Sequence, residues 1–163
     1  TVLHDYQLER LTSFVHPSQG MREESYQQSQ SLIAVGSGRL TGRGDDASQT
    51  ALGFVPEAHT DFVFAVVAER WGFAGATFVL ALYALLVGRA LTIALLAKDL
   101  FGRLIAGGIA AMLLFQVFVN VGMNIGIMPI TGVPLPLLTY GGSSVLTTLL
   151  AFGLLQSIRV HSR

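Results

Sequence analysis

The chain has 163 residues, of which 52% are hydrophobic and only 12% are charged, roughly half the charged share of an ordinary soluble domain. The net charge of +0 provides no basic footprint for nucleic acid, and the lack of cysteine excludes disulfides, thiolate metal sites and cysteine nucleophiles. The mean hydropathy of +0.58 indicates a membrane protein. Residues 1–17 have no apolar signal-peptide core, so we expect an earlier part in the natural protein.

Charged residues divide the chain into a polar first third and an apolar remainder. Residues 1–61 hold eight acids and four bases, whereas residues 62–163 hold two acids and six bases. Apolar residues at helical spacing predict a short helix that ends before Pro17 and a second helix over about 24–35. Glycines at 36 and 38 stop the second helix, and residues 36–50 are predicted to form a loop. Both helices are suited to a membrane surface.

Three transmembrane helices are predicted in the apolar remainder, near 71–89, 104–127 and 142–159. Residues 71–88 carry no charge, and about 20 apolar residues cross a bilayer. Residues 104–158 are also uncharged but would be roughly 80 Å long as one helix, so Pro129, Pro134 and Pro136 are expected to break them. Residues 128–141 are predicted to form a re-entrant-type loop. The fold class is an all-α polytopic transmembrane helix bundle.

The distribution of lysine and arginine predicts the orientation in the membrane. Basic residues lie between the first two predicted spans, at 89, 98 and 103, and at the C-terminus. Because cytoplasmic segments are enriched in such residues, residues 89–103 and the C-terminus are predicted to be cytoplasmic. Residues 1–61 then form an extracytoplasmic region and residues 62–163 form the transmembrane region, whose loop 128–141 also faces outward.

A polar stripe lies on the second predicted span, where Gln116, Asn120 and Asn124 recur every four residues. In lipid such a stripe needs polar partners. It indicates either contacts between helices or the lining of a polar cavity.

The densest group of functional side chains, Glu57, His59, Thr60 and Asp61, lies directly before an apolar stretch. Thr60 or Asp61 could simply cap the following helix. Alternatively, a carboxylate here could act as a general base on a hydroxyl group, with its pKa lowered by the helix dipole and raised by partial burial. A third interpretation is a metal site with Glu57, His59 and Asp61 as ligands.

A second segment rich in polar groups and glycine covers residues 128–144. Irregular backbone at membrane depth is tolerated only against protein or a wet cavity. Ser143 or Ser144 could cap the third span. The segment is therefore either a tight re-entrant turn with a cap or a loop that faces a ligand.

Two long motifs in these segments resemble the paired signatures of the SEDS family (shape, elongation, division and sporulation). They are PEAHTDFVFAVVAERWGFAGA and NIGIMPITGVPLPLLTYGGSS. The opening LHDYQLERLTSFVHP, the segment YQQSQSLIAVGSG and the spacing from Gln49 to Pro56-Glu57 are more similar to the RodA-like rod-shape branch than to the division branch. The resemblance covers nearly the whole chain and corresponds to the C-terminal half of a protein with about ten membrane helices.

The resemblance implies a multi-pass peptidoglycan glycosyltransferase in the bacterial cytoplasmic membrane, active in cell elongation. Such an enzyme polymerises lipid II, a disaccharide-peptide on undecaprenyl pyrophosphate, into β-1,4 glycan at the outer face. Its implied partners are a class B penicillin-binding protein and the elongation machinery. The family's essential acidic residue falls on Asp61, the implied general base. No cofactor is implied with certainty, although a divalent cation could assist the leaving pyrophosphate.

Further residues are assigned supporting roles by this resemblance. Glu57, His59, Thr60 and Gln49 could orient Asp61 or the acceptor sugar, while Ser37, Tyr140, Ser143 and Ser144 could meet the headgroup or line the cavity. Two other functions also fit these features. Proline-broken helices with a polar face suit a lipid II flippase, and a non-catalytic scaffold for the penicillin-binding protein would not need Asp61.

Overall fold

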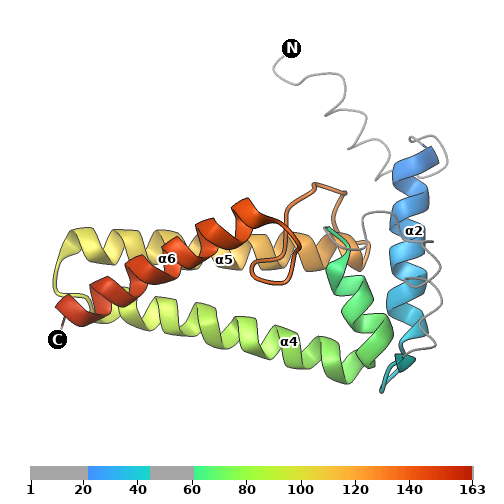
Figure 1. Cartoon of the computed structure of the whole chain (residues 1–163), viewed down its shortest axis with the longest axis horizontal. Helices are drawn as coiled ribbons and strands as arrows, with labels where there is room; N and C mark the ends of the chain where they lie inside the picture. Colours follow the sequence, from blue (N-terminus) through green and yellow to red (C-terminus); the bar gives the residue numbers. More distant parts are fainter. Residues whose placement is uncertain (1–21, 45–60, 163) are drawn as a thin grey trace, which may run out of the picture.

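The computed structural model describes residues 22–44 and 61–162 of the chain (Figure 1). Four α-helices follow one another in this part: α2 (Arg22–Ser37), α4 (Val63–Leu96), α5 (Leu100–Asn124) and α6 (Gly142–His161). The last three are long and apolar enough to cross a membrane. The structure thus confirms an all-α membrane fold with three candidate spans, and α2 covers the predicted helix 24–35. The predicted helix before Pro17 lies outside the described residues.

Helix α4 is interrupted at Gly72, where φ 67° and ψ −165° are not helical. The short segment before the interruption turns away from the long segment that follows, and packs beside α2 (Figure 1). The long segment, 73–96, measures about 36 Å at 1.5 Å per residue and can cross a hydrocarbon core of about 30 Å. It extends beyond the predicted end at 89 because Arg89 lies in the helix, where a long basic side chain can reach the membrane surface.

The loop that follows α2 supplies the hydrogen bonds lost at this interruption. In a continuous helix the N–H groups of residues 73 and 74 would bond to carbonyls four residues earlier. Instead, three backbone hydrogen bonds join α4 to the loop: Phe73 N to Arg39 O (2.8 Å), Ala74 N to Leu40 O (3.1 Å) and Arg43 N to Glu69 O (2.9 Å). Exposed backbone groups are costly in lipid, so this loop makes the broken helix tolerable.

The same contact requires glycine at position 38. A Cβ atom on Gly38 would overlap the main-chain carbonyl of Ala68. Gly38 is buried, and the next residue, Arg39, takes a left-handed φ of 48°. The backbones of the loop and of α4 are therefore in direct contact.

Helices α5 and α6 complete the bundle. Helix α5 lies antiparallel to the long segment of α4, and α6 crosses both (Figure 1). The second span was predicted near 104–127, but α5 begins at Leu100, where Arg103 Nε donates to Ala97 O (2.9 Å). It ends at Asn124 because the chain turns there, with the N–H groups of Ile127 and Met128 both donating to Gly122 O.

The predicted cap of the third span is wrong. Gly141, not Ser143 or Ser144, is the N-cap of α6, and it makes no side-chain capping bond. The carbonyls of both serines instead accept hydrogen bonds from Thr147 Oγ1 and Thr148 Oγ1, each at 2.8 Å. Both serines therefore lie in the first turn of the helix and not before it.

The loop between α5 and α6 folds back into the bundle. Leu135 is completely buried and belongs to a core cluster with Phe64, Ala68 and Tyr83. The hydroxyl of Tyr83 donates to the carbonyl of Pro136. Burial of one leucine contributes about 2 kcal/mol, so the loop is a fixed part of the structure.

We predict that Gly38→Ala destabilises the protein and that Gly36→Ala does not. The alanine methyl group at 38 would force the loop away from Ala68, at a cost of about 1–3 kcal/mol. Position 36 lies in α2 with open space around its Cβ, and Gly→Ala inside a helix stabilises by roughly 0.5–1 kcal/mol. Thermal unfolding of the full-length protein in detergent measures both; equal effects would contradict the backbone contact.

Candidate active site at the start of α4

Asp61 lies in a turn directly before α4, with its side chain partly buried. The prediction that Thr60 or Asp61 caps this helix is wrong, because the N-cap is Phe62 and no side chain of the cap residue bonds to the helix. Phe62 is 1% exposed and packs with Ala34 of α2 and Ala65 of α4. The apolar anchor at Phe62 therefore sets where the helix begins.

Two asparagine side chains of α5 hold the main chain of Asp61. Its carbonyl oxygen accepts hydrogen bonds from Asn120 Nδ2 (3.0 Å) and from Asn124 Nδ2 (3.2 Å). Asn120 Nδ2 also donates to Val133 O in the α5–α6 loop (2.8 Å). One buried amide group thus links the residue that carries the acid to the loop that passes beside it.

Asn124 extends this network to two further helices. Its Oδ1 accepts the N–H of Ala65 in the first turn of α4 (3.2 Å) and lies 3.3 Å from Ser31 Oγ of α2. Ser31 Oγ also donates to the Asn124 carbonyl (3.0 Å). Ser31, Asn120 and Asn124 are all 0% exposed, and buried amides are stable only when they are hydrogen-bonded in this way. We call these three residues and the Asp61 carbonyl the asparagine clamp.

The polar stripe of Gln116, Asn120 and Asn124 was predicted either to make contacts between helices or to line a polar cavity. The clamp favours the first interpretation for Asn120 and Asn124. Asn120 and Asn124 join helices and loops, as expected for contacts between helices. Gln116 behaves differently, because its Oε1 is buried without a hydrogen-bond partner among residues 22–44 and 61–162.

The carboxylate of Asp61 lies beside the α5–α6 loop. A Cβ atom on Gly132 would be 3.3 Å from Asp61 Oδ2, and Gly132 itself is exposed. The loop is held there by the bond from Asn120 to Val133 and by Gln28 Nε2, which donates to Met128 O (3.1 Å). The acid therefore has a main chain fixed by α5 and a partly buried side chain beside this loop.

Of the other predicted site residues, the four that the structure describes do not join this cluster. Gln49, Glu57, His59 and Thr60 lie outside the described residues. Ser37 ends α2, where its Oγ donates to Ala34 O (2.9 Å). Tyr140 is 88% exposed, and Ser143 and Ser144 begin α6. No hydrogen bond among described side chains links these last four residues to the asparagine clamp.

The metal interpretation stays a prediction. In the two described ranges no three histidine, aspartate or glutamate side chains converge. The proposed ligands Glu57 and His59 lie between those ranges, so the hypothesis with Asp61 rests on the sequence.

Two buried polar residues of α2 and α4 were not singled out by the sequence. Glu69, in the short segment of α4, is 0% exposed, and a carboxylate at membrane depth is expected to be functional or paired. The sequence did contain a signal for Glu69. It and its neighbour Arg70 are the only charged residues between Phe62 and Gly88. Ser31 gave no signal, because its role depends on Asn124, 93 residues away.

These features define a polytopic α-helical membrane protein with a carboxylate held at one end of its bundle. Residues 1–163 match the family of FtsW, RodA and SpoVE, described as cell cycle proteins. The chain belongs to this family, which confirms the resemblance drawn from its motifs.

Relatives in the family carry names that agree with the motifs. The chain is 46% identical over 163 residues to the peptidoglycan glycosyltransferase MrdB of Escherichia coli (strain K12), covering 99% of this chain and 44% of MrdB. It is also 46% identical to the peptidoglycan glycosyltransferase RodA of Treponema pallidum (strain Nichols), covering 98% and 37%. The chain thus spans less than half the length of these relatives.

A solved structure supports the same fold. That structure belongs to a peptidoglycan synthase complex and concerns the structural coordination of polymerization and crosslinking. The match has a TM-score of 0.80 at 36% identity and covers 98% of this chain and 43% of the other. The arrangement of helices around the asparagine clamp is therefore one that a larger membrane protein also uses.

We predict that Asn124→Leu destabilises the protein by about 1–3 kcal/mol. It removes the buried side-chain hydrogen bonds to the Asp61 carbonyl, the Ala65 N–H and Ser31 Oγ. The matched control is Gln116→Leu on the same helix. That change removes an oxygen without a described partner and should be neutral or stabilising. Thermal unfolding of the full-length protein in detergent compares the two variants. Asn124→Leu as stable as Gln116→Leu would contradict a structural role for the clamp.

Proposed function

We propose that this chain is the part of a peptidoglycan glycosyltransferase that supplies the general base, Asp61, for lipid II polymerisation. The observation that supports this most directly is the position of Asp61, with its carbonyl held by Asn120 and Asn124 and its Oδ2 beside the exposed Gly132. A base must lie within reach of the proton that it removes. The names of the relatives, which are more than twice as long, support the same activity.

The reaction requires one base. The donor sugar is α-linked to a lipid pyrophosphate, whereas the product is a β-1,4 glycan, so the anomeric carbon inverts. In a direct displacement the acceptor 4-hydroxyl attacks that carbon while Asp61 takes the hydroxyl proton. The new C–O bond forms as the bond to the pyrophosphate oxygen breaks, and undecaprenyl pyrophosphate leaves with the electron pair.

The leaving pyrophosphate needs positive charge, and the described residues near Asp61 offer little. Arg39 and Arg43 lie beside the interruption at Gly72, one helical segment of about 13 Å from Asp61 at 1.5 Å per residue. We infer that the rest of the protein, or a divalent cation, supplies this charge. Lipid II is the proposed substrate, and a class B penicillin-binding protein and the elongation machinery are the proposed partners.

The experiment that tests this function compares Asp61→Asn with Asp99→Asn in the full-length protein bound to its penicillin-binding partner. Asp61→Asn keeps the size of the side chain but removes the base, so we expect polymerisation of purified lipid II to fall by about 100-fold or more. Asp99 is an exposed residue between α4 and α5, and Asp99→Asn should polymerise normally. Size-exclusion chromatography checks that both variants still form the complex.

The alternatives predict different results. Full activity of Asp61→Asn would refute the proposed base. A wild-type complex that makes no glycan but moves lipid II across a vesicle membrane would favour a flippase, for which the polar face of α5 is also suited. If neither activity occurs and partner binding alone is needed, the chain is a scaffold.

We also propose an orientation, with residues 1–61 and the α5–α6 loop outside the cytoplasmic membrane and the C-terminus inside. The three basic residues at 89, 98 and 103 support it. We expect a single cysteine in place of the exposed Tyr140 to react with a membrane-impermeant maleimide in intact spheroplasts. A cysteine in place of the exposed Lys98 should react only after lysis. The measurement uses a cysteine-free background, and the reverse pattern would overturn both the orientation and the outer position of Asp61.

A further inference from the structure

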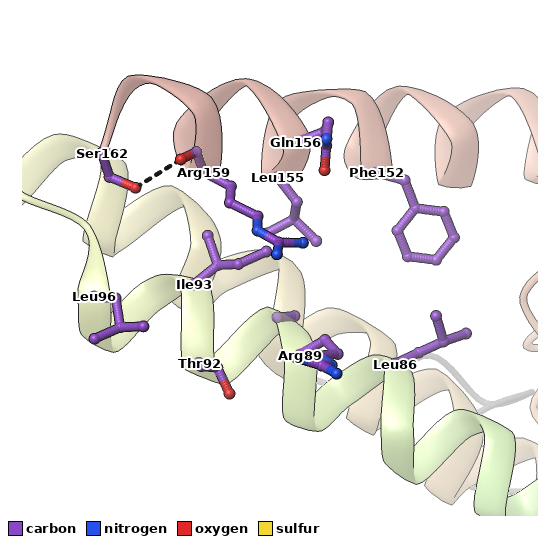
Figure 2. A pocket seen from close by; sticks show the side chains of 11 residues that line it. Leu86, Arg89, Thr92, Ile93, Leu96, Phe152, Leu155, Gln156, Arg159 and Ser162 are labelled. Carbon is purple, nitrogen blue, oxygen red and sulfur yellow. Dashed lines mark hydrogen bonds between the residues drawn. The ribbon is translucent and has the colours of Figure 1, made fainter.

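A second candidate site, a groove with both apolar and charged walls, lies at the opposite end of the bundle from Asp61, between α4 and α6. It is a groove of about 640 Å³, within the range of small-molecule sites. Figure 2 shows Arg89 of α4 and Arg159 of α6 on facing walls of this groove. The proposed reaction at Asp61 makes no use of it.

The two arginines provide positive charge that other described residues do not neutralise. Within residues 22–44 and 61–162, neither guanidinium forms an ion pair or hydrogen bond. The acid at this end of the described chain, Asp99, lies between α4 and α5 and does not line the groove. Arginine presents a planar fork of donors that matches the oxygens of a phosphate group.

The groove is amphipathic along its length. Polar groups of Gln156 and Ser162 lie on the same side as Arg159, near the end of α6. Leu86 and Phe152 line the other end, further into the bundle (Figure 2). A ligand that fits has an anionic head toward the helix ends and apolar chains toward the centre of the membrane.

We propose that this groove binds an anionic phospholipid, with Arg89 and Arg159 holding its phosphate and its acyl chains passing over Leu86 and Phe152. A single arginine near a helix end commonly reaches to the membrane surface. Two arginines that face each other across one apolar groove instead form the kind of basic pocket between helices that holds lipid headgroups on the cytoplasmic side. The site is independent of the proposed glycosyltransferase activity.

Native mass spectrometry of the full-length protein in detergent tests this proposal, with phosphatidylglycerol as the probe and phosphatidylcholine as the neutral comparison. We expect preferential binding of phosphatidylglycerol. Arg89→Gln and Arg159→Gln should each weaken it by about tenfold, because each removes a charge-assisted hydrogen bond. Arg159→Lys keeps the charge but loses the fork, so its loss should be smaller.

The matched control is Lys98→Gln, which removes one positive charge from the same end of the bundle but outside the groove. It should leave phosphatidylglycerol binding nearly unchanged. If Lys98→Gln and Arg159→Gln weaken phosphatidylglycerol binding equally, the binding depends on general surface charge and the proposed site is overturned. The proposal is also overturned if the unsubstituted protein shows no preference for phosphatidylglycerol. That result is expected if another part of the full-length chain fills the groove. Arg159 is exposed near the end of α6, so its variants test the site even where Arg89→Gln does not fold.

Discussion

The need to give every main-chain polar group a partner in an apolar environment governs this structure. Helix α4 leaves such groups at two places, at its first turn and at Gly72. At the first, Asn124 of α5 accepts the Ala65 N–H and Asn120 donates to the Asp61 carbonyl just before the helix. At the second, the loop after α2 supplies the partners. Because an unpaired group costs several kcal/mol in hydrocarbon, these contacts fix α2, the short segment of α4 and the α5–α6 loop relative to one another.

This arrangement positions the candidate base through its backbone. The clamp contacts the carbonyl of Asp61, while Asp61 Oδ2 lies beside the loop near Gly132. A side chain used for proton transfer must change its charge during the reaction, so contacts to it would have to adapt. Contacts to the main chain do not change with that charge, and the position of the residue can stay constant through the catalytic cycle.

Much of the bundle could be predicted from the sequence, because uncharged runs and prolines mark spans and loops directly. Helices α5 and α6 were predicted with ends within about four residues of the observed ones, a usual error for boundaries. A helix after Asp61 was expected, but the first span was placed from 71 because Glu69 and Arg70 interrupt the uncharged run. The turn at Gly72 was not predicted, because it depends on a loop some 30 residues away in sequence. A pattern based on neighbouring residues does not contain that contact.

The candidate site was predictable in part for a similar reason. Asp61 could be selected from its motif, and the spacing of Asn120 and Asn124 showed that they needed partners. The identity of those partners could not be read, since the Asp61 carbonyl has no side-chain signature and Ser31 is an unremarkable residue of α2. The prediction that Ser143 or Ser144 caps α6 was wrong, because Gly141 takes the extended N-cap conformation and both serines are already helical.

The separation of the clamp residues along the chain has a consequence for biosynthesis. Asn120 and Asn124 are 59 and 63 residues downstream of Asp61, and Val133 follows later still. At about 5–20 residues per second, the ribosome finishes α5 several seconds after it has made the acid. During that interval the first turn of α4 lacks its contacts with α5, and the Asp61 carbonyl lacks its two hydrogen bonds. A nascent chain inserted only as far as α4 therefore carries the acidic residue without a formed site, and the site is completed when α5 and the loop after it enter the membrane.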